Sequence, residues 1–186
     1  MNKIRKDIKN RRKQGEGGFT LIELVVAIGI MLILAAVATP FLLGHIKDAK
    51  VASLNEQVLN INAAFDSYYT KEGGILTDSD GDGNYLDDMI DAGWLSNDPS
   101  GKNGLNWTIE RYEDASHKVA YYVKITNADA SGYSYITDLA STLDEAIDGT
   151  DDGSNGRFQY NNDTTNSNFT GYYLLHADPG MSTWHS

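Results

Sequence analysis

The chain has 186 residues, no cysteine and a formal net charge of −11. This length fits about one domain, the lack of cysteine excludes disulfide bonds, and the acidic balance argues against nonspecific nucleic-acid binding, which needs clustered Lys and Arg. The charge is divided unevenly. Residues 1–18 hold seven basic and two acidic residues, a net charge of +5, and the remainder holds 8 basic and 24 acidic residues, a net charge of −16. We therefore expect one modest acidic head that binds no nucleic acid.

An apolar run occupies residues 19–43, directly after the basic leader 1–18. As a helix it would be about 37 Å long, more than the ~30 Å hydrocarbon core of a membrane. The basic leader should keep the N-terminus in the cytoplasm and send residues 44–186 outward. An ordinary signal peptide or a simple anchor is the alternative, but the cleavage site of a signal peptide follows its apolar core, and here Gly17 and Gly18 precede it.

One carboxylate, Glu23, lies inside this apolar run. An intramembrane acid is costly and indicates a partner, for which we expect another copy of the same chain. The alternative is a side chain that reaches the nearby headgroups, since Glu23 is only four residues past Phe19.

Residues 18–24, GFTLIEL, resemble the class III signal of type IV pilins and of the pseudopilins of type II secretion systems. The resemblance implies that a prepilin peptidase cuts after Gly18 and that the new N-terminal residue, Phe19, is N-methylated. It also implies that Glu23 pairs with the Phe19 amine of a neighbouring subunit as a filament grows, with related pilins and the pilus assembly machinery as partners. Independently, such a pair would neutralise both charges in an apolar medium and fix one axial register.

Pro40 is the second unusual residue of the run. Its missing N–H and its ring disfavour a continuous helix, so we expect a kink or an opened turn, which Gly44 would ease. The resembled family commonly has proline at this place, where assembled filaments lose helical hydrogen bonds. A proline that simply ends the span is the alternative.

Beyond Gly44 the pattern becomes amphipathic and predicts that one long helix runs from about Phe19 to Thr70, where Gly73 and Gly74 end it. The apolar stripe recurs at intervals of three and four residues: Val51, Leu54, Val58, Ile61, Phe65 and Tyr68.

The head shows four strand signals and one short helix. The predicted strands are residues 106–112 and 119–125, joined as a hairpin, and residues 157–160 and 171–175; the predicted helix is 139–147, and residues 161–168 are predicted as a surface loop. A four-stranded antiparallel sheet packed on the long helix gives an α+β fold, which the resemblance identifies with the pilin fold.

An acidic segment after the helix resembles the start of an EF-hand calcium loop. Its candidate ligands are Asp78, Asp80, Asp82, Asn84, Asp87 and Asp88. The segment departs from the full pattern at its twelfth position, which is Met89 rather than glutamate. The alternative is a solvated acidic turn. A second cluster, residues 148–156, lacks the alternation and is better interpreted as a turn.

We find no catalytic motif and expect no enzyme. The sequence favours a prepilin that enters the cytoplasmic membrane as a single-pass precursor with its head outside and is then polymerised through its apolar helix into an extracellular type IV pilus-like filament. The alternatives are a pseudopilin that acts in protein export within the envelope, and a monomeric membrane-anchored calcium-binding surface protein.

Overall fold

The computed structural model describes residues 18–74 and 76–185. The chain forms two compact units, Met1–Ile46 and Lys47–Ser186, and helix α2 (Leu21–Lys71) contributes residues to both. The predicted leader up to residue 17 lies outside the described residues. The head unit adds helices α3 (Tyr85–Asp91), α4 (Ala130–Thr137) and α5 (Ala140–Asp148), the 3-10 helix η1 (Lys102–Gly104), and strands β1 (Leu105–Glu113), β2 (Val119–Asn127), β3 (Phe158–Asp163) and β4 (Asn168–Ala177).

In the first unit, α2 is an apolar helix whose large side chains are exposed. Within the described residues it is the one helix long and apolar enough to cross a membrane. The helix continues without interruption through Pro40, so the proline does not end the helix, and the turn stays helical rather than opened. At the residue before Pro40, the Thr39 hydroxyl donates to the carbonyl oxygen of Ala35 at 2.7 Å.

In the second unit, the predicted apolar stripe of α2 is confirmed. All six of its residues, from Val51 to Tyr68, are buried. The helix ends at Lys71, shortly before Gly73 and Gly74, which have φ angles of 77° and 93°, and the N–H of Gly74 donates to the carbonyl of Tyr69 at 2.9 Å. These positive φ angles are accessible to glycine at little cost, which is why the helix stops there.

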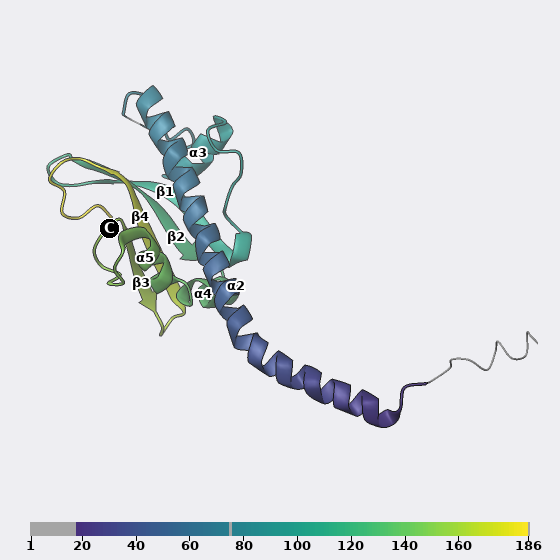
Figure 1. Ribbon diagram of the computed structural model, residues 1–186. Helices are drawn as coiled ribbons and strands as arrows, with labels where there is room; N and C mark the ends of the chain where they lie inside the picture. The colour runs from purple at the N-terminus through teal and green to yellow at the C-terminus, as the bar shows by residue number, and fades with distance from the viewer. Residues whose placement is uncertain (1–17, 75, 186) are drawn as a thin grey trace, which may run out of the picture. The chain divides into compact units, whose positions relative to one another are not determined.

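The four strands form one antiparallel sheet in the order β1-β2-β4-β3 (Figure 1). The predicted hairpin of the first two strands is confirmed. The predicted loop over residues 161–168 is confirmed only for the exposed turn of residues 164–167, because β3 continues to Asp163 and β4 begins at Asn168. The reason is that β3 is an edge strand, whose outer residues face solvent and therefore carry the polar side chains that the sequence suggested for a loop.

Helices and sheet share one core, which confirms the α+β fold with the long helix on a four-stranded antiparallel sheet. Figure 1 shows the second half of α2 lying over the sheet, and the inward-facing strand residues Trp107, Val123 and Tyr173 belong to the same buried cluster as the α2 stripe. The opposite face of the sheet is covered in part by the C-terminal segment, where Trp184 packs near Tyr122. Sequence analysis did not find α3, α4 or this C-terminal cover.

Asp144 of α5 is the one buried charged residue among the described residues. Its Oδ2 accepts hydrogen bonds from the backbone N–H groups of Asp152 (3.0 Å) and Gly153 (2.9 Å), whereas its buried Oδ1 has no partner. Burial, reinforced by the charges of Asp148 and Asp152, raises the pKa of Asp144 above its ordinary value of 3.8. The charged form is therefore disfavoured in the folded head.

We expect Asp144→Asn to stabilise the head at neutral pH. When the pKa of an acid is higher in the folded state than in the unfolded state, the folded state binds its proton more tightly. The free energy of unfolding therefore falls as the pH rises through the folded pKa. Asparagine resembles the protonated side chain and avoids this loss. Denaturant unfolding of both proteins at several pH values should show that the variant has the higher free energy of unfolding at pH 7 and that this difference shrinks toward pH 4. A difference in the free energy of unfolding that does not change with pH would contradict this account.

Candidate functional site

The peptide bond between Gly18 and Phe19 lies before the first helical residue, Leu21. Both residues are exposed, and Phe19 retains 88% of its accessible surface. No atom outside the local chain lies within 4 Å of a Cβ built on Gly18. Within the residues that the structure describes, nothing therefore obstructs access to the predicted cleavage bond.

Thr20 and Glu23 form a reciprocal pair at the start of α2. The Thr20 hydroxyl oxygen accepts the backbone N–H of Glu23 at 3.3 Å, and Glu23 Oε2 accepts the backbone N–H of Thr20 at 2.9 Å and its hydroxyl at 3.0 Å. This is the capping box of a T-x-x-E sequence, which satisfies N–H groups that have no partner within the helix. It explains why the helix begins at Leu21.

Glu23 thus has a local role that sequence analysis missed, although the T-x-x-E spacing was a sufficient signal. The capping contacts hold the carboxylate on the first turn of the helix, beside the residue that follows Phe19. Only Oε2 is engaged in these contacts. Pro40 lies 17 residues further along the same helix, about 25 Å away, so the structure does not bring Glu23 and Pro40 into one site.

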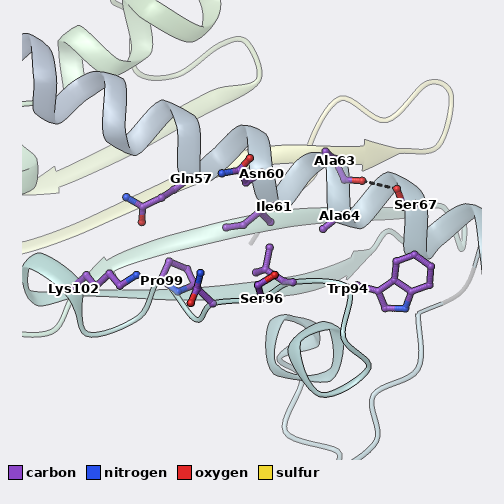
Figure 2. Close-up of a pocket in the computed structure, with 12 residues that line it drawn as sticks. Gln57, Asn60, Ile61, Ala63, Ala64, Ser67, Trp94, Ser96, Pro99 and Lys102 are labelled. Atoms are coloured by element: carbon purple, nitrogen blue, oxygen red, sulfur yellow. Dashed lines mark hydrogen bonds between the residues drawn. The ribbon is translucent and has the colours of Figure 1, made fainter.

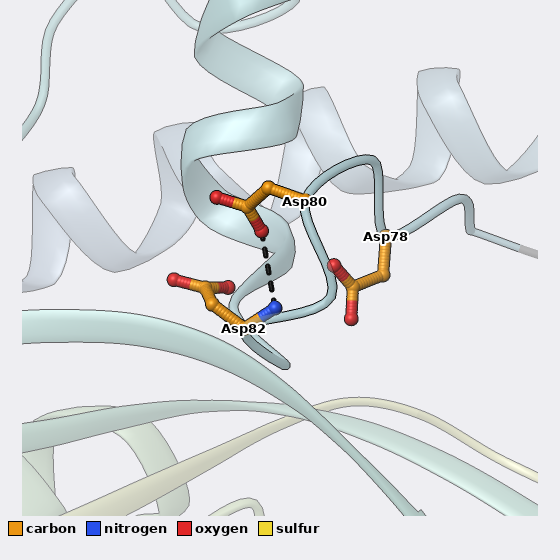
Figure 3. Close-up of side chains that lie close together, drawn as sticks. All are labelled: Asp78, Asp80 and Asp82. Carbon is orange, nitrogen blue, oxygen red and sulfur yellow. Dashed lines mark hydrogen bonds between the residues drawn. The ribbon is translucent and has the colours of Figure 1, made fainter.

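In the head, the structure gathers Asp78, Asp80 and Asp82 (Figure 3). One carboxylate oxygen of each lies within 4.8 Å of the others. Oxygens bound to a single Ca²⁺ at 2.3–2.6 Å are at most about 5 Å apart, so the three carboxylates fit one calcium ion. Asp78 is partly buried, and the other two residues are exposed.

These carboxylates also accept hydrogen bonds from backbone N–H groups of their own loop. Asp78 accepts the N–H groups of Gly81 (2.6 Å) and Gly83 (3.1 Å), and Asp80 accepts the N–H of Asp82 (3.1 Å). Gly81 and Gly83 have φ angles of 82° and 84°, which the tight turns require. A carboxylate oxygen that accepts one hydrogen bond still has lone-pair capacity for a cation.

The remaining predicted ligands do not belong to this group of three carboxylates. The Asn84 side-chain oxygen caps α3 by accepting the N–H of Leu86 and also accepts the N–H of Ile109 in β1, both at 3.1 Å, so both of its lone pairs are used. Asp87 and Asp88 lie in the first turn of α3. Oδ1 of Asp88 accepts the N–H of Ser79, and its buried Oδ2 has no partner. Partial burial, with the charges of Asp82 and Asp80, raises the pKa of Asp87.

The second acidic cluster, residues 148–156, behaves as a turn. Asp148 accepts the N–H groups of Arg157 (3.0 Å) and Phe158 (2.8 Å), and Asp152 accepts those of Ser154 (3.0 Å) and Asn155 (2.8 Å). Among the described residues, the only three acidic or histidine side chains that converge as metal ligands are those of the first loop.

Comparison with protein families places the prokaryotic N-terminal methylation motif at residues 13–39. This is the signature of type IV pilins and pseudopilins, and the chain carries it together with the long apolar helix and the antiparallel sheet described above. The motif marks a structural class of pilin-like precursors rather than a class of enzymes. A comparison with curated proteins and a comparison with solved structures found no match.

Proposed function

We propose that this chain is the precursor of a type IV pilus-like filament subunit. A prepilin peptidase removes the leader after Gly18, Phe19 is N-methylated, and the subunits polymerise through the apolar part of α2. The observation that carries the proposal is the position of the methylation motif: it lies across an exposed Gly18–Phe19 bond that is followed at once by an exposed apolar helix with Glu23 in its first turn.

The precursor is inserted in the cytoplasmic membrane with its head outside, as the basic leader and the apolar helix favour. In the membrane, lipid covers the apolar side chains that are exposed in the chain by itself. In the filament, the same side chains pack against neighbouring copies. This exchange of lipid for protein brings Glu23 of one subunit to the new amine of Phe19 on the next, so that neither charge stays unpaired.

Shearing of cells distinguishes the two filament types that share this motif. We expect the mature protein in the sheared extracellular fraction and on fibres labelled with antibody to the head. Retention of all mature protein in the envelope, together with loss of protein export on deletion, would instead identify a secretion pseudopilin. Mature protein that stays monomeric in the membrane would contradict both forms of the proposal.

The loop that carries Asp78, Asp80 and Asp82 is the calcium site of this proposal. Three carboxylate oxygens within 4.8 Å supply hard ligands, and backbone carbonyls or water complete the coordination. Bound calcium would neutralise part of the charge that the loop concentrates between α2 and α3. The ion would have a structural role, fixing the loop against the sheet through Asn84 and Ile109.

We expect calcium to raise the melting temperature of the full-length protein in detergent. A ligand at about 100 times its Kd stabilises the folded state by about 2.7 kcal/mol, or roughly 8 °C for a head of this size. The variant with both Asp80→Asn and Asp82→Asn should lose this shift. Asp163→Asn, which changes a carboxylate that accepts the N–H of Thr165 in the β3–β4 turn, should keep this shift. A melting temperature that chelator leaves unchanged would contradict the calcium site.

A further inference from the structure

The head has a groove between the second half of α2 and the segment that connects α3 to β1 (Figure 2). Its volume is about 500 Å³, within the range of sites that hold small ligands. Figure 2 shows Trp94 at one end and Lys102 at the other, with Gln57 and Asn60 on the helix above the segment that carries Ser96.

The connecting segment is held in place by hydrogen bonds to the backbone of β1 and α3. The Ser100 hydroxyl donates to the carbonyl of Trp107 at 3.1 Å and accepts its N–H at 3.2 Å. The backbone N–H of Trp94 donates to the carbonyl of Met89 at 2.9 Å. Pro99 is buried beneath the groove. The walls are therefore tied to β1 and α3, and the groove is formed without a ligand.

Apart from Lys102, the polar side chains of the lining are neutral, and they surround one aromatic side chain. Amide groups come from Gln57, Asn60 and Asn97, and a hydroxyl group comes from Ser96. Within the described part of the chain, the side chains of Asn60, Ser96 and Asn97 make no hydrogen bond. They can therefore donate to and accept from a ligand at no cost to the fold.

Trp94 is half-buried. Lys71 lies 4.9 Å from its ring centroid, and Tyr68 packs against it at 5.8 Å between centroids. These contacts hold the indole, part of which lines the groove. Ala63 and Ala64 have small side chains on the opposite wall, so a flat ring can approach the helix closely.

The charge of the lining narrows the class of ligand. No acidic residue lines the groove, although residues 19–186 carry a net charge of −16. Lys102 is the one charged residue of the lining. The groove therefore suits a neutral ligand or one with an isolated carboxylate, and it lacks the clustered cations that a phosphate backbone needs.

We propose that this groove binds a saccharide. Sugars present an apolar C–H face, which packs on an indole, and vicinal hydroxyl groups, each of which is both a donor and an acceptor. An amide side chain matches such a pair because it offers a donor and an acceptor side by side. The groove provides both elements, one aromatic side chain and several amides with unused hydrogen-bonding capacity.

The test uses the unassembled full-length protein in a zwitterionic detergent that has no sugar headgroup. The probes are tetrasaccharides of glucose, of N-acetylglucosamine and of galacturonic acid. Trp107 and Trp184 are buried, so a ligand in the groove should change chiefly the fluorescence of Trp94. We expect at least one probe to give a saturable change with a Kd of about 1 mM or lower. If none of the three binds, the proposal is overturned.

Two variants test whether the saccharide binds in the groove. Asn60→Ala and Asn97→Ala remove side chains that make no contact needed for folding, and each should weaken binding about fivefold by calorimetry, the effect of one lost hydrogen bond. Asn161→Ala, a change at an exposed edge-strand residue, is the matched control and should leave binding unchanged. Equal affinity in all three variants would overturn the proposal. Because the protein is unassembled, this result is independent of filament formation.

Discussion

Replacing Glu23 with lysine is expected to abolish incorporation of the protein into filaments and to leave the precursor inserted in the membrane. The apolar helix that anchors the precursor is unchanged, but the carboxylate that would meet the Phe19 amine of a neighbour becomes a second cation. Two cations facing each other in an apolar medium are strongly unfavourable. The measurement is the amount of variant protein in sheared fibres relative to the membrane fraction.

The capping box makes a sharper control available. Glu23→Gln keeps an oxygen that can cap Thr20, since glutamine also serves in a capping box, but it removes the charge. Thr20→Val removes the hydroxyl contact with Glu23 and keeps the charge. If charge pairing drives assembly, Glu23→Gln loses incorporation and Thr20→Val retains it. The reverse pattern would mean that Glu23 acts only as a helix cap.

Gly132→Ala is expected to cause the largest loss of head stability. A Cβ on Gly132 in α4 would overlap the carbonyl oxygen of Gly104 in η1, where backbone approaches backbone and no flexible side chain can move aside. Overpacking of this kind costs about 3 kcal/mol or more, equivalent to a fall of roughly 10 °C in melting temperature for a head of this size. Thermal unfolding of the full-length protein in detergent measures the change.

Ser134→Ala is the matched control for this prediction. Ser134 is exposed on the same helix, so the substitution tests any general effect of alanine in α4, and we expect a change within about 0.5 kcal/mol. A Gly132→Ala variant as stable as the Ser134→Ala variant would show that η1 and α4 separate easily, and that their close contact does not contribute to the stability of the head.

Much of the fold could be predicted because periodicity identifies elements that bury one face. The stripe from Val51 to Tyr68 is such a case, and so is the hairpin of β1 and β2, whose alternating residues lie in the core. Helix α4 could not be predicted in this way. Its sequence, ASGYSYIT, has weak helical preference. The helix depends on the Asp129 cap and on the contact between Gly104 and Gly132, which lie far apart in the sequence.

The candidate sites also differ in whether they depend on local sequence or on contacts between distant segments. Glu23 and the Gly18–Phe19 bond are local features, so a short motif was sufficient to locate them, and the capping role of Glu23 could have been inferred from the spacing of Thr20. The role of Asn84 could not, because it depends on a strand 25 residues away. The groove also required the fold, since the fold places Asn60 of α2 and Asn97 of a distant loop in the same lining.

Mass spectrometry of the mature N-terminus tests the central claim most directly. The protein purified from cells that express the prepilin machinery should begin at Phe19, and this residue should carry an N-methyl group. A chain that still begins at Met1, or one cut within or after the apolar helix, would contradict the assignment of this protein to the prepilin pathway.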